Sequence, residues 1–164
     1  MPPADDYFAR FGLDRRFDID EQALNARYRA LVAQSQASGG TGVAEIEDAR
    51  RVLADPALRA DYLLNLTGGP SARDLGTVLG VQRQTMDGLR KQWGDATARG
   101  DQAALDAVRQ AISAERQARL GCVATLFRML TGGDGPVVQR DRRRNLRMEI
   151  TALRELGGIG ATGP

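Results

Sequence analysis

The stretch ADPALRADYLLNLTGG, residues 54 to 69, carries the clearest helix signals in the first half of the chain. Asp55 can cap a helix, and Pro56 suits a first helical turn because its nitrogen has no hydrogen to leave unpaired. Gly68 can end the helix. Its apolar face consists of Leu58, Tyr62, Leu63 and Leu66. The stretch therefore predicts an amphipathic helix that packs on other helices.

Three further helices are predicted before this stretch. A short helix with an aromatic face occupies residues 6 to 13, a second begins after the potential cap Asp20, and a third spans Val43 to Ala54. Together the four helices form a predicted domain of residues 1 to 68. Its predicted core consists of Tyr7, Phe11, Leu24, Tyr28, Leu31, Ile46, Leu53, Leu58 and Tyr62.

The second half of the chain predicts a three-helix bundle. Glycine, proline and polar residues at 69 to 74 indicate a linker, and apolar residues recur at helical spacing through residues 75 to 157. The glycine-rich end, residues 158 to 164, predicts a flexible tail. Because no segment shows the alternation of a β-strand, we expect an all-α protein.

The composition argues against an enzyme. The chain has no histidine and a single cysteine, which removes histidine-based catalysis, an internal disulfide and the usual zinc ligands. We therefore expect no metal and no cofactor. No apolar run is long enough to span a bilayer, and the first residues lack the pattern of a signal peptide, so we expect a cytoplasmic protein without membrane attachment.

Two blocks in the first half resemble a known family. These are DYFARFGLDRRFDIDEQALNARYRAL, residues 6 to 31, and DPALRADYLLNLTG, residues 55 to 68. Together they resemble the J-domain of HscB-type co-chaperones, which serve iron–sulfur cluster assembly. The resemblance implies a J-domain-like four-helix unit followed by a three-helix bundle. It also implies two partners, a DnaK-type chaperone and the iron–sulfur scaffold protein.

The defining motif of that family is absent from this sequence. J-proteins carry His, Pro and Asp after their second helix, and this tripeptide couples them to ATP hydrolysis by the chaperone. Alignment on Arg27, Tyr28 and Leu31 puts Gln36, Ala37 and Ser38 at its place. We expect the helix to end before a flexible run that cannot hold one acceptor for an arginine of the chaperone. The sequence thus predicts a co-chaperone-like protein unable to stimulate the ATPase.

Two groups of residues are candidates for partner contacts. The resemblance implies that Arg27 and Arg29 face the chaperone, although two arginines on a helix can simply be solvated. The family binds its scaffold through acidic and apolar residues of the first bundle helix, which correspond here to Met86, Asp87, Leu89 and Trp93. Buried packing is the competing interpretation of the apolar ones.

The last helix raises a further possibility. Arginines at positions 140 to 147 could bind phosphates, but helical spacing scatters them and no aromatic residue interleaves, so nucleic-acid binding is not expected. The alternative to the co-chaperone role is a non-catalytic helical adaptor that binds other proteins on an HscB-like scaffold.

Overall fold

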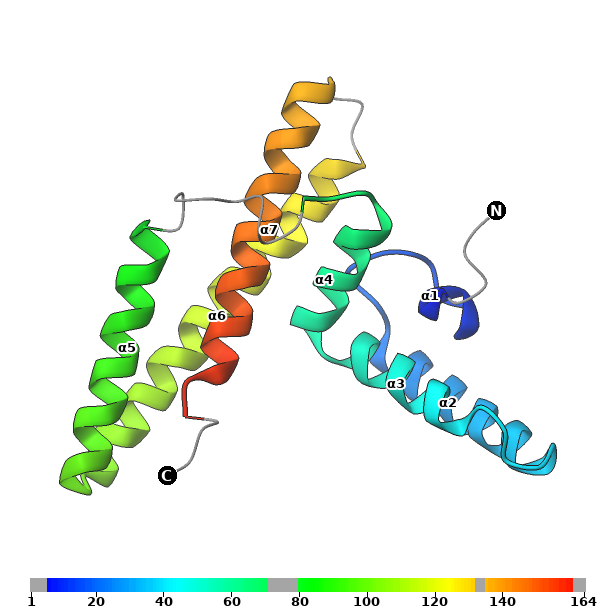
Figure 1. Cartoon of the computed structure of the whole chain (residues 1–164), viewed down its shortest axis with the longest axis horizontal. Coiled ribbons are helices and arrows are strands. Elements are labelled where there is room, and N and C mark those ends of the chain that lie inside the picture. Colours follow the sequence, from blue (N-terminus) through cyan, green and yellow to red (C-terminus); the bar gives the residue numbers. More distant parts are fainter. Residues whose placement is uncertain (1–5, 71–79, 132–134, 161–164) are drawn as a thin grey trace. The chain divides into compact units, whose positions relative to one another are not determined.

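The computed structural model describes residues 6–70, 80–131 and 135–160, and their ordered elements are all α-helices (Figure 1). The predicted all-α fold is confirmed. The chain divides into two compact units, with Leu66 the last residue of the first and Thr67 the first residue of the second. Each unit is described on its own below.

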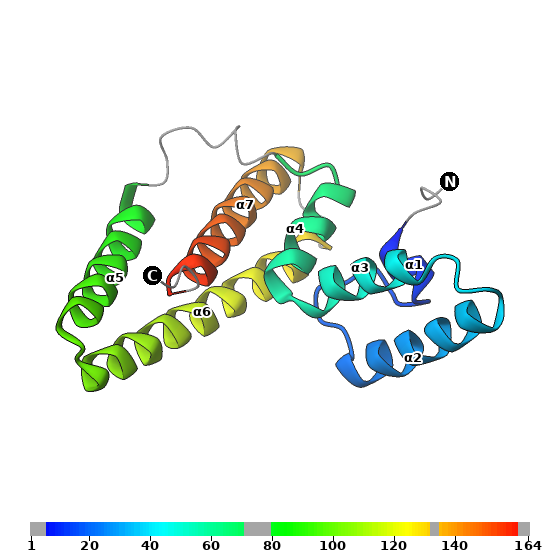
Figure 2. The same cartoon turned by 60° about the horizontal axis from the view of Figure 1, so that its bottom comes forward.

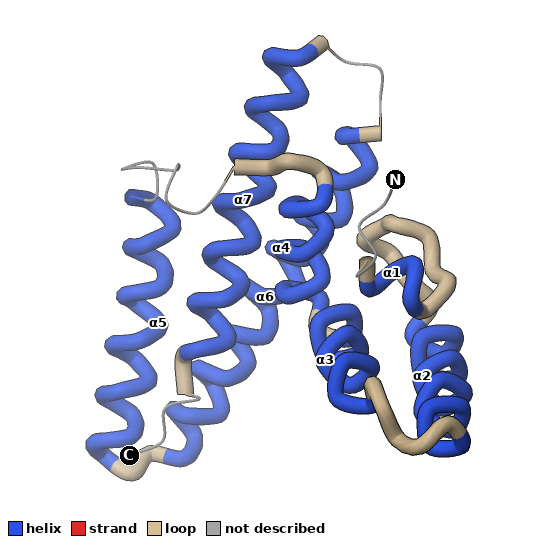
Figure 3. Tube along the Cα trace, turned by 45° about the vertical axis from the view of Figure 1, so that its right-hand side comes forward, coloured by secondary structure: helices blue, strands red, loops and turns tan. Residues whose placement is uncertain are grey.

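The first unit consists of α1 (Tyr7–Arg10), α2 (Glu21–Ala37), α3 (Val43–Ala54) and α4 (Pro56–Leu66). Helix α3 contacts each of the other three, and Figure 3 shows α2 and α3 side by side as a hairpin. Asp20 caps α2 by accepting hydrogen bonds from the main-chain N–H groups of Gln22 and Ala23. Such a cap typically contributes about 1 kcal/mol.

The core of the first unit differs in part from the predicted set. Phe11, Leu24, Ile46 and Leu53 are buried as expected, whereas Tyr7, Tyr28, Leu31, Leu58 and Tyr62 are only half-buried. Other side chains complete the core, namely Phe8, Phe17, Ala49, Ala57, Ala60, Leu63 and Leu64. The two aromatic rings of Tyr7 and Tyr62 stack with centroids 4.6 Å apart at the edge of this core. A small unit has too few interior positions to bury every apolar residue of its helices.

A buried arginine joins three segments of the first unit. Arg59 is 6% exposed and donates hydrogen bonds to the carbonyls of Phe17, at 2.9 Å, and Leu53, at 2.5 Å. Its guanidinium also lies over the Phe17 ring, 5.1 Å from the centroid. Burial lowers the pKa of Arg59 from its ordinary value. Arg59 therefore links α4 to the end of α3 and to the segment before α2.

The second unit contains α5 (Gly80–Arg99), α6 (Gln102–Leu130) and α7 (Pro136–Gly158). Helix α6 packs against both others, as Figure 2 shows. The core of this second unit is formed by Met86, Leu89, Ala96, Val108, Val123, Phe127, Leu146, Ile150, Ala152, Leu153 and Leu156. Between α6 and α7, the half-buried Arg119 bridges Glu115 and Glu149 at 2.6 Å and 3.0 Å.

The predicted tail, residues 158 to 164, begins at the last residue of α7. Helix α7 continues through Gly158, and Ile159 packs against a cluster of Met86, Leu89, Ala152 and Leu156. The apolar contact of Ile159 outweighs the low helix propensity of the two preceding glycines. The remaining tail residues, 161–164, and most of the predicted linker, 71–74, lie outside the described residues.

Candidate functional site

The predicted break of α2 before residue 36 is wrong. Gln36 and Ala37 are the last two residues of α2, and Ser38 is its C-cap. Alanine and glutamine are good helix formers, so the helix continues until glycine stops it. The degenerate tripeptide position is thus a helix end rather than a flexible run.

The connection from α2 to α3 is short and closed by hydrogen bonds. The main-chain N–H of Gly40 donates to the Ser35 carbonyl at 2.8 Å, and the Ser35 hydroxyl donates to the Thr41 carbonyl at 2.5 Å. Gly39, Gly40 and Gly42 have φ values of 95°, 78° and 88°. Other residues rarely adopt this left-handed conformation, so these glycines permit the reversal. No residue from 31 to 42 carries a charge, and the connection therefore offers no carboxylate to a partner.

The structure separates the two arginines expected to contact a chaperone. Arg27 donates hydrogen bonds to the carbonyls of Phe11 and Gly12, at the end of α1. Arg29 is exposed and has no hydrogen bond or ion pair with the part of the chain that the structure describes. Residues two positions apart on a helix point in different directions. Arg27 is therefore engaged within the unit, and Arg29 remains available to a partner.

A third arginine covers another part of α2. Arg50, from α3, lies over the Tyr28 ring at 4.7 Å from the centroid and donates a hydrogen bond to Asn25 Oδ1 at 3.2 Å. The spacing within each helix could not reveal this contact, because it depends on the pairing of α2 with α3. The consequence is that Tyr28 does not present an open aromatic face to a partner.

A polar cluster joins α1 to α3. The Tyr7 hydroxyl donates to Asp48 Oδ2 at 3.0 Å, and Arg51 forms an ion pair with the same carboxylate. The hydrogen bond to Asp48 raises the pKa of Tyr7, whereas the bonds from Arg51 and Tyr7 lower the pKa of Asp48. These interactions are confined to the unit and place no proton donor or acceptor at the end of α2.

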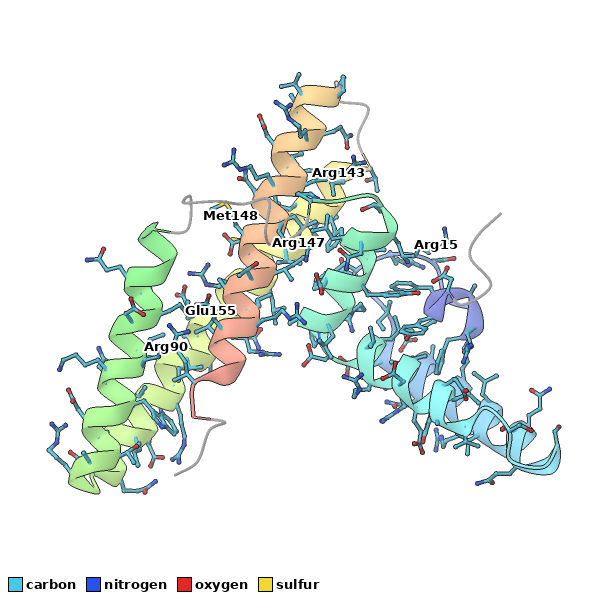
Figure 4. All side chains as sticks on the ribbon, in the orientation of Figure 1. Arg15, Arg90, Arg143, Arg147, Met148 and Glu155 are labelled. Carbon is cyan, nitrogen blue, oxygen red and sulfur yellow. The ribbon has the colours of Figure 1, made fainter. Side chains whose placement is uncertain are left out.

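The expected scaffold-contact residues do not form one exposed stripe. Met86 and Leu89 are 1% and 8% exposed, so the packing interpretation holds for both. Asp87 is exposed and pairs with Arg90 at 3.1 Å, and Arg90 extends from α5 to Glu155 of α7 at 3.2 Å (Figure 4). Trp93 is half-buried, with the Arg109 guanidinium 5.4 Å from its ring centroid. A contact on this helix would therefore involve Asp87 and the edge of Trp93.

The described residues contain no group of three or more acidic, cysteine or histidine side chains that could hold a metal ion. Within the same residues, no helix is long and apolar enough to cross a membrane. Cys122 is exposed on α6.

Comparison with known proteins identifies the family. No protein-family model matches the chain. A co-chaperone protein HscB homolog of Ralstonia nicotianae is 30% identical over 157 residues, which cover 87% of this chain and 87% of that protein. This chain belongs to the HscB co-chaperone family. A second HscB homolog, from Burkholderia multivorans, is 34% identical over 75% of this chain and 78% of its own length.

Solved structures bear out the HscB-like fold. The crystal structure of human co-chaperone protein HscB matches with a TM-score of 0.76 and 18% identity, covering 96% of this chain and 79% of that chain. The chaperone HscB from Vibrio cholerae matches with a TM-score of 0.66 and 24% identity, covering 94% of this chain and 97% of that chain. The predicted HscB co-chaperone family and its HscB-like fold are confirmed.

Proposed function

We propose that this HscB-family co-chaperone acts in cytoplasmic iron–sulfur cluster assembly by binding a DnaK-type chaperone without accelerating its ATPase. The role is non-enzymatic. One observation carries the proposal: the position of the family's tripeptide is a helix end, made of Gln36, Ala37 and the cap Ser38, and no residue from 31 to 42 is charged.

The physical argument concerns which chaperone state is stabilised. A co-chaperone accelerates hydrolysis only if it binds the hydrolysis-competent state more tightly than the resting state, since equal binding to both shifts nothing. In the family the tripeptide carries this preference. Neutral side chains at the end of α2 cannot form the charge-assisted hydrogen bonds of an aspartate. Docking can therefore persist while stimulation is lost.

Docking would depend on fewer residues than the sequence suggested. Arg27 already bonds the carbonyls of Phe11 and Gly12, so its charge is directed into the unit. Both arginines are exposed, but Arg29 is the one without a hydrogen bond or ion pair to the part of the chain that the structure describes. We accordingly assign the chaperone contact to Arg29, with Arg27 as a positioning residue that fixes α1 against α2.

The test is a steady-state ATPase assay with a DnaK-type chaperone. We expect the purified chain alone to leave the rate unchanged and, at high concentration, to reduce stimulation by an intact J-protein. Arg29→Gln should weaken that inhibition, whereas Arg99→Gln, an exposed arginine at the end of α5, should not. Several-fold stimulation by the wild-type chain would contradict the proposal.

The adaptor alternative makes a different prediction in the same assay and in cells. An adaptor that has lost the chaperone would give no inhibition at any concentration. A pull-down from the native cell would then recover unrelated proteins, whereas recovery of a DnaK-type chaperone together with an iron–sulfur scaffold protein would support the proposed role. The exposed Asp87 makes Asp87→Asn the first substitution for examining scaffold recovery.

A further inference from the structure

The first half of α7 carries arginines that fall into two groups. Arg142 donates to the Met129 carbonyl at 2.8 Å, and Arg147, only 4% exposed, donates through Nε to the Pro70 carbonyl at 2.6 Å. Arg140, Arg143 and Arg144 make no hydrogen bond or ion pair with the part of the chain that the structure describes. Two arginines are thus structural, and three are available to a ligand.

The three available arginines line one open pocket. Its volume is about 470 Å³, and it is lined by Gly68, Pro70, Arg140, Asp141, Arg143 and Arg144. Figure 4 labels Arg143 and Arg147, which lie one turn apart along α7. Arg147 donates a hydrogen bond to the carbonyl of Pro70, which also lines the pocket, and so fixes Pro70 against α7. The described residues that line the pocket contribute three guanidinium groups and one carboxylate, and so a net positive charge.

One arginine that lines this pocket, Arg143, has a buried atom without a hydrogen-bond partner in the part of the chain that the structure describes. The Nε of Arg143 is buried and has no hydrogen-bond partner among the described residues. A buried donor without an acceptor is unfavourable, because it loses its hydrogen bond to water and gains none. An anionic ligand in the pocket would supply acceptors for the Arg143 guanidinium. This observation separates the pocket from an ordinary solvated basic face.

The surroundings of the pocket favour a protein ligand over a phosphate polymer. Val137 is 62% exposed and lies three residues before Arg140 and seven before Arg144, which places it on the same face of α7. The described residues that line the pocket include no aromatic side chain on which bases could stack. Carboxylates separated by an apolar side chain match both the arginines and Val137.

We propose that this arginine pocket of α7 binds an acidic peptide segment of a partner protein, with an apolar residue of that segment seated on Val137. The proposal does not depend on chaperone docking, which involves α2 of the other unit. Its partner is defined by glutamate or aspartate side chains spaced along an extended or helical segment.

The test uses the full chain and a fluorescein-labelled peptide of sequence EELEELEE. We expect binding that weakens as salt rises, and no binding of the uncharged peptide QQLQQLQQ. Arg144→Gln and Arg140→Gln should each weaken binding about tenfold, which corresponds to about 1.4 kcal/mol and is the scale of one charge-assisted hydrogen bond. Val137→Ser should weaken it at constant charge.

Two controls make the result decisive. Arg99→Gln removes one exposed arginine at the end of α5 and should leave binding unchanged; an equal loss there would show nonspecific attraction and overturn the proposal. No binding of EELEELEE by the folded wild-type chain would also overturn it. So would preferential binding of a single-stranded oligonucleotide that abolishes peptide binding, because it would identify a phosphate surface. Unchanged circular dichroism would establish that each variant is folded.

Discussion

At the scale of single residues, the charge of an arginine does not show whether it stabilises the fold or binds a partner. Three arginines donate hydrogen bonds to main-chain carbonyls of other segments, namely Arg27, Arg59 and Arg147. A guanidinium has several donors in a rigid plane and a long apolar stem, so it can bridge buried carbonyls of separate segments. These arginines stabilise the fold, whereas Arg29, Arg140, Arg143 and Arg144 remain available to partners.

Arg59 provides a direct test at this scale. Arg59→Ala removes the donor for the Phe17 and Leu53 carbonyls in a buried position, and we expect the first unit to lose about 2 to 4 kcal/mol of unfolding free energy. Arg59→Lys should recover only part of the loss, because an ammonium cannot reproduce the planar fork. Urea denaturation measures both changes. A loss no larger than that of the exposed control Arg51→Ala would contradict the assigned role.

The stacked tyrosines predict a loss of stability at alkaline pH. The pKa of Tyr7 is raised by its hydrogen bond to Asp48, and the pKa of Tyr62 is raised by burial. Folding therefore favours the neutral phenols: their contribution is complete below the unfolded pKa of about 10 and is lost as pH rises through the higher folded values. Tyrosinate absorbance measures this titration. Tyr7→Phe and Tyr62→Phe should each remove part of its high-pH component, and an unchanged component in both variants would contradict the assignment.

At the scale of elements, the length of α2 is the decisive feature of the candidate site. The helix continues through Ala37 because nothing before Gly39 breaks it, and the three left-handed glycines then complete the reversal to α3. Two of the three residues aligned with the family's tripeptide, Gln36 and Ala37, thus have helical backbone geometry. A functional motif at this point would need a turn as well as the right side chains.

This predicts that restoring the motif does not restore activity. In the triple variant Gln36→His, Ala37→Pro, Ser38→Asp, the proline disfavours helical geometry at residue 36 and removes the N–H of residue 37. We expect the last turn of α2 to unwind, at a cost of up to about 3 kcal/mol, without stimulation of a DnaK-type ATPase. Far-ultraviolet circular dichroism and the ATPase assay measure the two effects. The matched variant Gln36→His, Ser38→Asp should keep its helix, and strong stimulation by the triple variant would show that side chains alone were missing.

At the scale of the whole molecule, each of the two units has its own set of buried side chains. The chromophores separate in the same way: all three tyrosines, Tyr7, Tyr28 and Tyr62, belong to the first unit, and the single tryptophan, Trp93, belongs to the second. Tyrosine and tryptophan signals therefore report on different units.

We expect the two units to respond separately to core truncation. Leu24 and Leu153 are 1% and 0% exposed, so replacement of either by alanine should cost about 2 to 5 kcal/mol in its own unit. Leu24→Ala should shift the urea transition seen by near-ultraviolet tyrosine signals, and Leu153→Ala the one seen by Trp93 fluorescence. If either substitution shifted both transitions equally, the chain would unfold as one cooperative unit instead.

How much the sequence predicted depends on the range of the interaction. Caps such as Asp20, the helix after Pro56 and the apolar stripes of the bundle are local patterns, and local backbone preferences and helical spacing were enough to predict those helices. The same sequence contained the two blocks that indicated the family. The sequence also contains no histidine, so the His-Pro-Asp tripeptide is missing.

Only the tertiary structure decided which side chains remain available. Arg27 and Arg29 are equivalent in the sequence, but the carbonyls of α1 lie beside one of them. The sequence made Met86 and Leu89 candidate contact residues, but in the fold both are buried against α7 and Ile159. The sequence did not show which of the arginines at positions 140 to 147 are already bonded within the fold, as Arg142 and Arg147 are. The sequence by itself determined the helices and the missing motif, because both depend on residues close together in the chain. Burial and hydrogen-bond partners depend on segments far apart in sequence, and these only the fold brings together.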